Sequence, residues 1–168
     1  MRPDLPRDSR LGRAARIAAA ALLLALAARP AEPPAAPEAF SIEVTLVGGP
    51  NLNPNLEGHA SPVVVRLFEL RRTAAFQAAS FEALFSHAKE ALGDDLVAQE
   101  EFLLRPGEIR HHDRIGGPGA AALGLVAAFR TLEGDSWRLI VPVAAGVHNL
   151  VLVDFDQHRI RAPSLSTD

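Results

Sequence analysis

Residues 40–49 read FSIEVTLVGG, and this stretch decides the fold. Apolar side chains occupy every second position: Phe40, Ile42, Val44 and Leu46. A period of two predicts a β-strand with one buried face, and the glycines at 48 and 49 end it. The next apolar stretch, residues 63–70 (VVVRLFEL), is apolar on both faces, which is typical of a strand in the middle of a sheet.

Short strand patterns recur through the rest of the chain. Turn-forming residues separate them, and they fall at residues 102–104, 109–115, 121–131, 137–143, 149–155 and 158–161. Alternation in the stretch 137–143 places Trp137 on the same face as Leu139, Val141 and Val143. We therefore expect Trp137 to be largely buried.

One stretch has a helical pattern instead. Apolar residues at helical spacing define one face: Phe81, Leu84, Phe85, Ala88 and Leu92. Ser80 is suited to cap the helix at its N-terminus, and Gly93 to end it. Residues 73–79 are compatible with a short preceding turn. A single helix cannot form half of a bundle, so we expect it to cover one face or end of a sheet.

The sequence thus predicts a mainly β domain. We expect an antiparallel β-sandwich of about eight strands with hairpin connections and a short helical insertion. This domain spans residues 40–162, and residues 163–168 form a C-terminal tail.

The N-terminal residues are typical of an export signal. Arginines precede an apolar run at 17–28, whose length of about 12 residues suits a signal sequence but not a membrane-spanning helix. We expect residues 1–28 to be a signal peptide or, alternatively, an uncleaved N-terminal anchor. Residues 29–39 form a Pro/Ala-rich linker. A bacterial lipoprotein signal ends in cysteine, yet Arg29 follows Leu26-Ala27-Ala28 and the chain contains no cysteine. A lipid anchor is therefore not expected.

Charge and composition exclude several kinds of function. Residues 40–168 carry 11 basic and 16 acidic side chains, a net charge of −5. An acidic domain argues against nucleic acid and anionic lipid as main partners. Without cysteine, thiol catalysis and zinc–thiolate sites are impossible.

Few motifs suggest chemistry. In the cluster His111-His112-Asp113, a strand would turn His112 to the face opposite the other two, so a metal site would need further ligands. The glycines of residues 116–119 precede a strand rather than a helix, which indicates a hairpin turn and not a phosphate loop. No Gly-x-Ser-x-Gly elbow is present. We expect no catalytic residue, no cofactor, no metal and no small-molecule substrate.

The loop at residues 51–62 differs from the others. It is rich in turn formers but contains two leucines, Leu52 and Leu56. Either they pack back onto the sandwich, or the loop presents them to a partner. On the second interpretation, Leu52→Asp and Leu56→Asp abolish binding and leave thermal stability almost unchanged. The candidate partner-binding residues are Asn51, Leu52, Asn53, Asn55, Leu56, Glu57 and His59.

An ordered set of motifs resembles a known family. The motifs are SPVVVRLFEL at 61–70, Phe81-x-x-Leu84-Phe85, Leu92-Gly93-x-Asp95-Leu96, EFLLRPGE at 101–108, LGLVAAFR at 123–130 and Ser136-Trp137-Arg138. Their order and spacing resemble the type VI secretion lipoprotein family, TssJ (also VasD or SciN). The resemblance covers about residues 40–161.

The resemblance implies a transthyretin-like β-sandwich and a structural role in the periplasm, at or near the outer membrane. Family members bind the periplasmic C-terminal region of the inner-membrane protein TssM, in a complex that also contains TssL. In the family, the loop between the first two strands contacts the partner. The corresponding loop in this sequence is residues 51–62. Without the lipidated cysteine, the chain would be held by its partner, by another protein's anchor, or by an uncleaved N-terminus.

Two alternatives belong to other classes. A transthyretin-like hydroxyisourate hydrolase would end in Tyr-Arg-Gly-Ser, but this chain contains no tyrosine. A carbohydrate-binding sandwich would need a row of exposed aromatic side chains, and the only tryptophan lies in an alternating strand.

Overall fold

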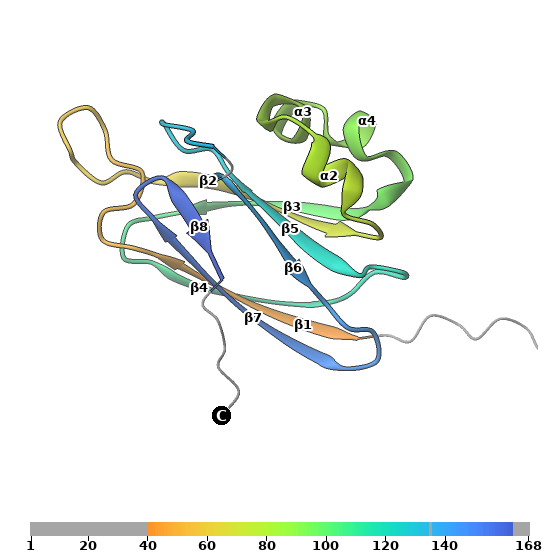
Figure 1. Cartoon of the computed structure of the whole chain (residues 1–168). Helices are drawn as coiled ribbons and strands as arrows, with labels where there is room; N and C mark the ends of the chain where they lie inside the picture. The colour runs from red at the N-terminus through yellow and green to blue at the C-terminus, as the bar shows by residue number, and fades with distance from the viewer. Residues whose placement is uncertain (1–39, 135, 163–168) are drawn as a thin grey trace, which may run out of the picture. The chain divides into compact units, whose positions relative to one another are not determined.

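The computed structural model describes residues 40–134 and 136–162. Within these residues, eight strands form two four-stranded sheets packed face to face, and a group of helices covers one sheet (Figure 1). The strands are β1 (Ser41–Gly48), β2 (Val63–Leu70), β3 (Leu96–Leu104), β4 (Ile109–Ile115), β5 (Ala122–Ala127), β6 (Arg138–Pro142), β7 (His148–Asp156) and β8 (Arg159–Arg161). The helices are α2 (Ala74–Ala78), α3 (Phe81–Ser86) and α4 (Ala88–Leu92), followed by a 3-10 turn at Gly93–Asp95. The predicted mainly β sandwich is confirmed.

The strand order differs from a set of simple hairpins. One sheet has the order β4-β1-β7-β8, and the other β3-β2-β5-β6. All pairings are antiparallel except that of β1 with β7, which is parallel over the whole of β1. The hairpin predicted at residues 116–119 is wrong, because β4 and β5 belong to different sheets. Only β5–β6 and β7–β8 are direct hairpins among the described strands.

The glycines at residues 116–119 allow the chain to pass from β4 in one sheet to β5 in the other. A Cβ at Gly116 would lie 2.3 Å from the Phe40 ring, and one at Gly117 would lie 2.4 Å from Val97. Only glycine permits such a close approach of the backbone. The Gly117 N–H also donates to Glu69 Oε2 at 2.7 Å.

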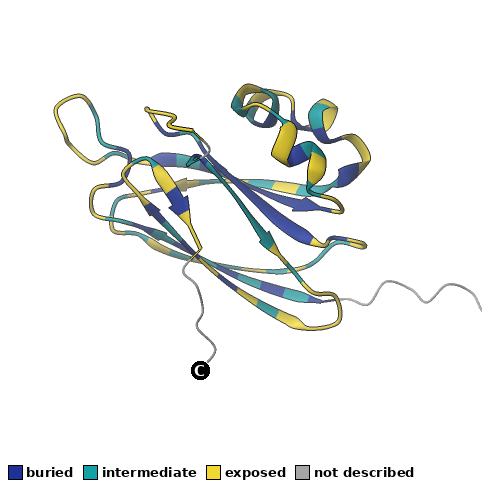
Figure 2. Cartoon of the chain, in the orientation of Figure 1, coloured by how far each residue is buried: buried dark blue, intermediate teal, exposed yellow. Residues whose placement is uncertain are grey.

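The packing of the core explains the apolar patterns of residues 40–46 and 63–70. In β1 every second residue is buried, as the period of two predicts. The second half of β2 is buried on both faces, because the opposite sheet covers one face and the helices cover the other. On the helix side, Phe68 meets Phe76 of α2 at a ring-centroid distance of 5.7 Å. The burial pattern of Figure 2 follows this layering.

Trp137 is 6% exposed, and the prediction of its burial is confirmed. Its ring packs edge-on against Phe81 of α3, with centroids 5.4 Å apart. The tryptophan therefore joins the helical group to the sheet edge at β6.

The helical group begins as predicted and then departs from the pattern. Ser80 Oγ accepts a hydrogen bond from the Ala83 N–H at 3.2 Å, so it does cap α3. The expected single helix is broken at His87, whose backbone (φ −133°, ψ 37°) is not helical. The break lets α3 and α4 turn separately against the sheet, where Leu84, Ala88 and Leu92 are still buried. None of the helices in the described ranges is long and apolar enough to cross a membrane.

A row of charged side chains fills the gap between the edge strands β3 and β4. Glu69 is completely buried, and its Oε1 lies 2.5 Å from Arg114 Nε. Arg114 also reaches Glu100 at 2.5 Å, and Glu100 contacts His112 Nε2 at 2.9 Å. Inward-pointing charges on edge strands discourage pairing with another chain's strand.

Candidate functional site

The loop between β1 and β2 projects from one end of the sandwich (Figure 1). Its base is built like part of the core. Leu52 N–H donates to the Gly49 carbonyl at 3.2 Å, which closes a turn with Pro50 at its second position. The turn directs Leu52 inward, where its side chain is 0% exposed.

Leu52 therefore packs back onto the sandwich. The prediction that it can be changed without loss of stability is wrong, because its whole side chain belongs to the hydrophobic core. Its carbonyl also accepts a hydrogen bond from the Ser61 N–H at 2.9 Å, which joins the two arms of the loop.

Asn53 is the second buried residue of the base, at 4% exposed. Its Oδ1 accepts from the Arg130 N–H at 2.8 Å, and its Nδ2 donates to the Pro62 carbonyl at 2.8 Å. Its own N–H donates to the Gln157 carbonyl at 2.8 Å. With φ at +45°, the backbone is left-handed, a conformation that asparagine tolerates better than most residues. Asn53 thus orients the loop and is not available to bind a partner through its side chain.

The tip of the loop has a different construction. Asn55 Oδ1 accepts hydrogen bonds from the N–H groups of Glu57 (3.0 Å) and His59 (2.9 Å). The Asn55 N–H donates to the His59 carbonyl at 2.9 Å, and Gly58 supplies a positive φ of 82°. The side-chain oxygen of asparagine commonly closes such turns. The tip is therefore held by its own hydrogen bonds rather than by the core.

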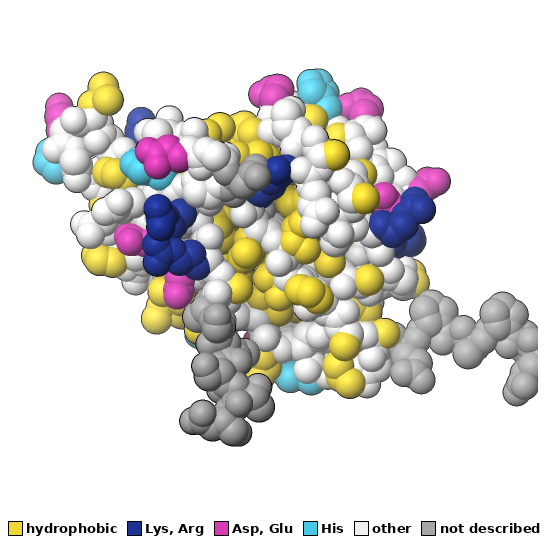
Figure 3. All heavy atoms as spheres, viewed as in Figure 1, with side chains coloured by type: hydrophobic (Ala, Val, Ile, Leu, Met, Phe, Trp, Pro, Cys, Tyr) yellow, Lys and Arg dark blue, Asp and Glu magenta, His cyan; other side chains and the backbone are white. Residues whose placement is uncertain are grey.

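Leu56 stands at this tip with its side chain fully exposed, at 107% relative accessibility. Glu57 and His59 flank it and approach each other at 3.4 Å, with about three quarters of each side chain in solvent. Figure 3 shows hydrophobic, acidic and histidine surface together on the projecting loop. Asn51 is also exposed, at the base. The structure thus divides the seven predicted residues: Leu52 and Asn53 are internal, whereas Asn51, Leu56, Glu57 and His59 face solvent and Asn55 shapes the tip.

The other sequence motifs do not form a site in the described residues. His111 Nδ1 contacts Thr45 Oγ1 at 3.0 Å, while His112 points between the sheets toward Glu100. Across residues 40–134 and 136–162, no group of three or more potential ligands is placed to hold a metal ion.

One polar row on the outer face of β1 and β7 was missed by sequence reasoning. Ser41 Oγ lies 2.6 Å from His148 Nδ1, and His148 Nε2 lies 3.6 Å from Glu43. Ser41 and His148 are direct neighbours in the parallel ladder, so cross-strand pairing accounts for their contact. Since β1 and β7 are far apart in sequence, no local pattern could have revealed it.

The turn between β3 and β4 supports the base of the loop. The Gly48 N–H donates to the Glu108 carbonyl at 2.8 Å, and the Gly107 N–H donates to the Gly48 carbonyl at 2.8 Å. The Glu108 carboxylate accepts from the Arg105 N–H at 2.9 Å and from Arg110 at 2.7 Å. The backbone hydrogen bond from Arg105, followed by that from the Arg110 side chain, lowers the pKa of Glu108 below its ordinary value of 4.5.

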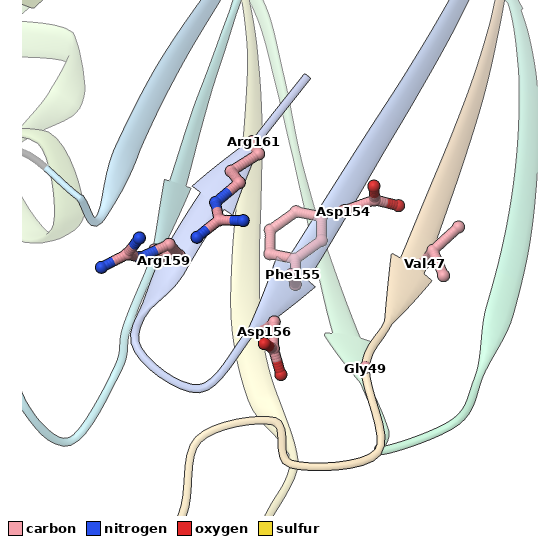
Figure 4. Close-up of a pocket in the computed structure, with 7 residues that line it drawn as sticks. All are labelled: Val47, Gly49, Asp154, Phe155, Asp156, Arg159 and Arg161. Atoms are coloured by element: carbon pink, nitrogen blue, oxygen red, sulfur yellow. The ribbon is translucent and has the colours of Figure 1, made fainter. Parts of the chain in front are cut away.

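A hollow of about 280 Å³ lies beside the loop, over β7 and β8 (Figure 4). Its lining residues are Val47, Gly49, Asp154, Phe155, Asp156, Arg159 and Arg161. In Figure 4 the two arginines project to one side of the hairpin, whereas Asp154 points toward Val47 on the other. The hollow is open to solvent on one side, and its charged lining lies at the end of the sandwich from which the loop projects.

The comparisons with known proteins agree with this architecture. Residues 41–158 match the family model described as type VI secretion lipoprotein, VasD, EvfM, TssJ. The T6SS lipoprotein TssJ1 from Pseudomonas aeruginosa is 37% identical, with a TM-score of 0.68, over 75% of this chain and 95% of that one. No curated protein matches the chain.

Two further solved structures share the fold at lower identity. Lip from Serratia marcescens, described as a membrane-bound component of the type VI secretion system, is 20% identical with a TM-score of 0.68, over 73% of this chain and 96% of that one. A chain of the structure described as the T6SS protein TssM C-terminal domain (869-1107) from EAEC is also 20% identical, with a TM-score of 0.66, over 74% of this chain and 98% of that one. The family model spans well over half of the sequence, and the chain therefore belongs to the type VI secretion lipoprotein family that includes VasD and TssJ.

Proposed function

We propose that this protein is a structural, non-enzymatic subunit of the type VI secretion membrane complex, and that it binds the periplasmic C-terminal region of TssM through the tip of the β1–β2 loop. TssL belongs to the same complex in this proposal. The protein acts in the periplasm, at or near the outer membrane. Membership of the lipoprotein family supports the setting.

Leu56 is the observation that carries the proposal. A fully exposed leucine on a tip closed by hydrogen bonds contributes nothing to the core, yet the ordered backbone of the tip holds it at a defined position. A loop backbone that is already ordered loses less conformational entropy on binding than a flexible one. Leu56 is therefore suited to enter an apolar pocket of a partner, with Glu57 and His59 at the rim.

Retention of the protein is a separate part of the proposal. The chain contains no cysteine to carry a lipid. The signal peptide or anchor expected at residues 1–28, the linker at 29–39 and the tail at 163–168 all lie outside the described residues. We propose that contact with TssM contributes to holding this subunit in place.

The variant Leu56→Asp tests the loop assignment. The full chain would be titrated with a TssM periplasmic fragment by calorimetry, and its melting temperature measured in parallel. Because burial of a leucine contributes about 1.5–3 kcal/mol, its loss should weaken binding roughly ten-fold or more. The melting temperature should stay the same.

Leu150→Asp is the matched control. Leu150 is also exposed, at 60%, but it lies on the outer face of β7 instead of on the loop. It should bind TssM as the wild type does. Equal affinity of Leu56→Asp and wild type would remove the tip from the interface.

A further inference from the structure

Three connections meet at the end of the sandwich that carries the loop. Asn53 joins the β1–β2 loop to Arg130 of the β5–β6 connection and to Gln157 of the β7–β8 hairpin. Ser136 Oγ donates to the His158 carbonyl at 2.9 Å, which ties the second and third connections together. The three therefore form one continuous surface around the base of the projecting loop.

This surface holds a distinctive set of arginines. Arg130, Arg159 and Arg161 are exposed, and within the described residues their guanidinium groups make no hydrogen bond, ion pair or ring contact. Every other arginine of the described ranges is engaged through its side chain: Arg66, Arg71, Arg72, Arg105, Arg110, Arg114 and Arg138. Among the described residues, the unengaged arginines thus lie only at the loop end of the sandwich.

The hairpin arginines are available despite their acidic neighbours. The ladder sets Arg161 opposite Asp154 and Arg159 opposite Asp156. No ion pair joins these residues, and Figure 4 shows the guanidinium groups directed away from the Asp154 carboxylate. In Figure 3, Lys and Arg side chains gather on the surface close to the projecting loop.

We infer that Arg130, Arg159 and Arg161 form an anion-binding rim at the base of the loop that presents Leu56, and that the partner surface they meet is an acidic protein surface beside an apolar pocket. This inference rests on the proposed function, since it assigns chemistry to the same interface. Guanidinium groups match carboxylates in geometry and charge. The exposed Leu132 of the β5–β6 connection, at 43%, extends the apolar part of the surface.

The arginine rim favours one orientation of the bound partner over others. The chain from residue 40 onward is acidic overall, with a net charge of −5, so its long-range field repels an acidic partner. Only the orientation that places the partner's carboxylates on the arginines replaces repulsion with attraction. Charges at the rim of an interface act mainly on orientation and on the association rate.

The test reverses the charges of the rim. Full-length variants Arg130→Glu and the pair Arg159→Glu with Arg161→Glu would be titrated with the TssM periplasmic fragment at low and high salt. Lys89→Glu, in the helical group away from the loop, makes the same change of charge as Arg130→Glu and half that of the pair, and serves as the control. We expect the reversed rim to weaken binding about ten-fold at low salt, with most of the difference lost at high salt, while the control binds normally.

The outcomes separate this inference from the proposed function. If Leu56→Asp weakens binding but the reversed rim binds normally at low salt, the acidic partner surface is wrong and the loop assignment stands. If neither weakens binding, the proposed function fails as well. If the reversal leaves TssM binding unchanged but abolishes binding to phosphatidylglycerol vesicles, the arginines face a membrane, which overturns the inference. Arg159→Gln with Arg161→Gln gives a milder change in case the reversed pair does not fold.

Discussion

The base and the tip of the β1–β2 loop are only a few residues apart, yet different forces hold them. At the base, Leu52 is 0% exposed and Asn53 is hydrogen-bonded to two other connections. At the tip, Leu56 is fully exposed and Asn55 closes a turn that contacts only itself. Two leucines in one loop therefore differ in environment: Leu52 is part of the hydrophobic core, and Leu56 is exposed to solvent.

The largest expected effect is at the base. Leu52→Ala should lower the free energy of unfolding by about 2–5 kcal/mol, because it removes a fully buried side chain and leaves a cavity. Urea denaturation followed by Trp137 fluorescence would measure it. Affinity for TssM should fall only as far as the folded fraction falls. An unchanged unfolding midpoint would mean that the base is not part of the core.

Asn53→Ala should have the next largest effect. It removes the partners of the Arg130 N–H and the Pro62 carbonyl, and an unsatisfied buried polar group costs about 1–3 kcal/mol. Because Asn53 also orients the loop, TssM binding should weaken more than the loss of stability explains. If the variant melts lower but the folded protein binds normally, Asn53 stabilises the fold without positioning the tip.

Gly58→Ala examines the tip alone. Gly58 has a φ of +82° and no atom within 4 Å of an added Cβ, so the change strains the backbone without a clash. A left-handed backbone costs a non-glycine residue about 1–2 kcal/mol. The tip should relax locally, with weaker TssM binding and a melting temperature lowered by only a few degrees.

Gly93→Ala is the matched control for this variant. Gly93 also has a positive φ, +50°, and open space around it, but it ends α4 in the helical group. It should share the small loss of stability and bind TssM more strongly than Gly58→Ala. Equal affinities would argue that the shape of the tip is unimportant.

The sequence predicts much of this fold because its patterns are local. Alternation in residues 40–46 and the cap at Ser80 each depend on neighbours a few positions away, and both are confirmed. The parallel pairing of β1 with β7 and the crossing at residues 116–119 depend on contacts between distant segments. The break at His87 reflects packing of α3 and α4 on the sheet, which overrides a continuous helical pattern.

The sequence was sufficient to locate the candidate site in the loop, but not to tell its buried residues from its exposed ones. Leu52 and Leu56 both stand among turn formers, and no periodicity distinguishes an inward leucine from an outward one in a loop. The turn at Pro50 and the contact between Asn53 and Gln157 determine that Leu52 points inward. The contact between Asn53 and Gln157 is long-range in sequence. The rim arginines were missed for the same reason, since Arg130 and the β7–β8 hairpin meet the loop only in the folded chain.

The smallest expected effect is on the pH dependence of stability. It involves Glu108, in the β3–β4 turn that supports the start of the loop. The folded pKa of Glu108 lies below its ordinary value of 4.5, because the Arg105 N–H and the Arg110 side chain favour the carboxylate. The group therefore stabilises the fold fully above its unfolded pKa, and this contribution disappears as the pH falls through the folded pKa. An ion pair on the surface contributes about 0.2–1 kcal/mol.

Glu108→Gln should accordingly be slightly less stable than the wild type at neutral pH, and the difference should shrink as the pH falls below about 4.5. Melting curves of both proteins from pH 7 to pH 3 would measure it. Because the Glu108 carbonyl supports Gly48 at the start of the loop, the change acts on the base, and TssM affinity at neutral pH should stay near that of the wild type. A stability difference that grows on acidification would contradict the lowered pKa. A large loss of affinity at neutral pH would instead mean that the β3–β4 turn, and not only the tip, contacts the partner.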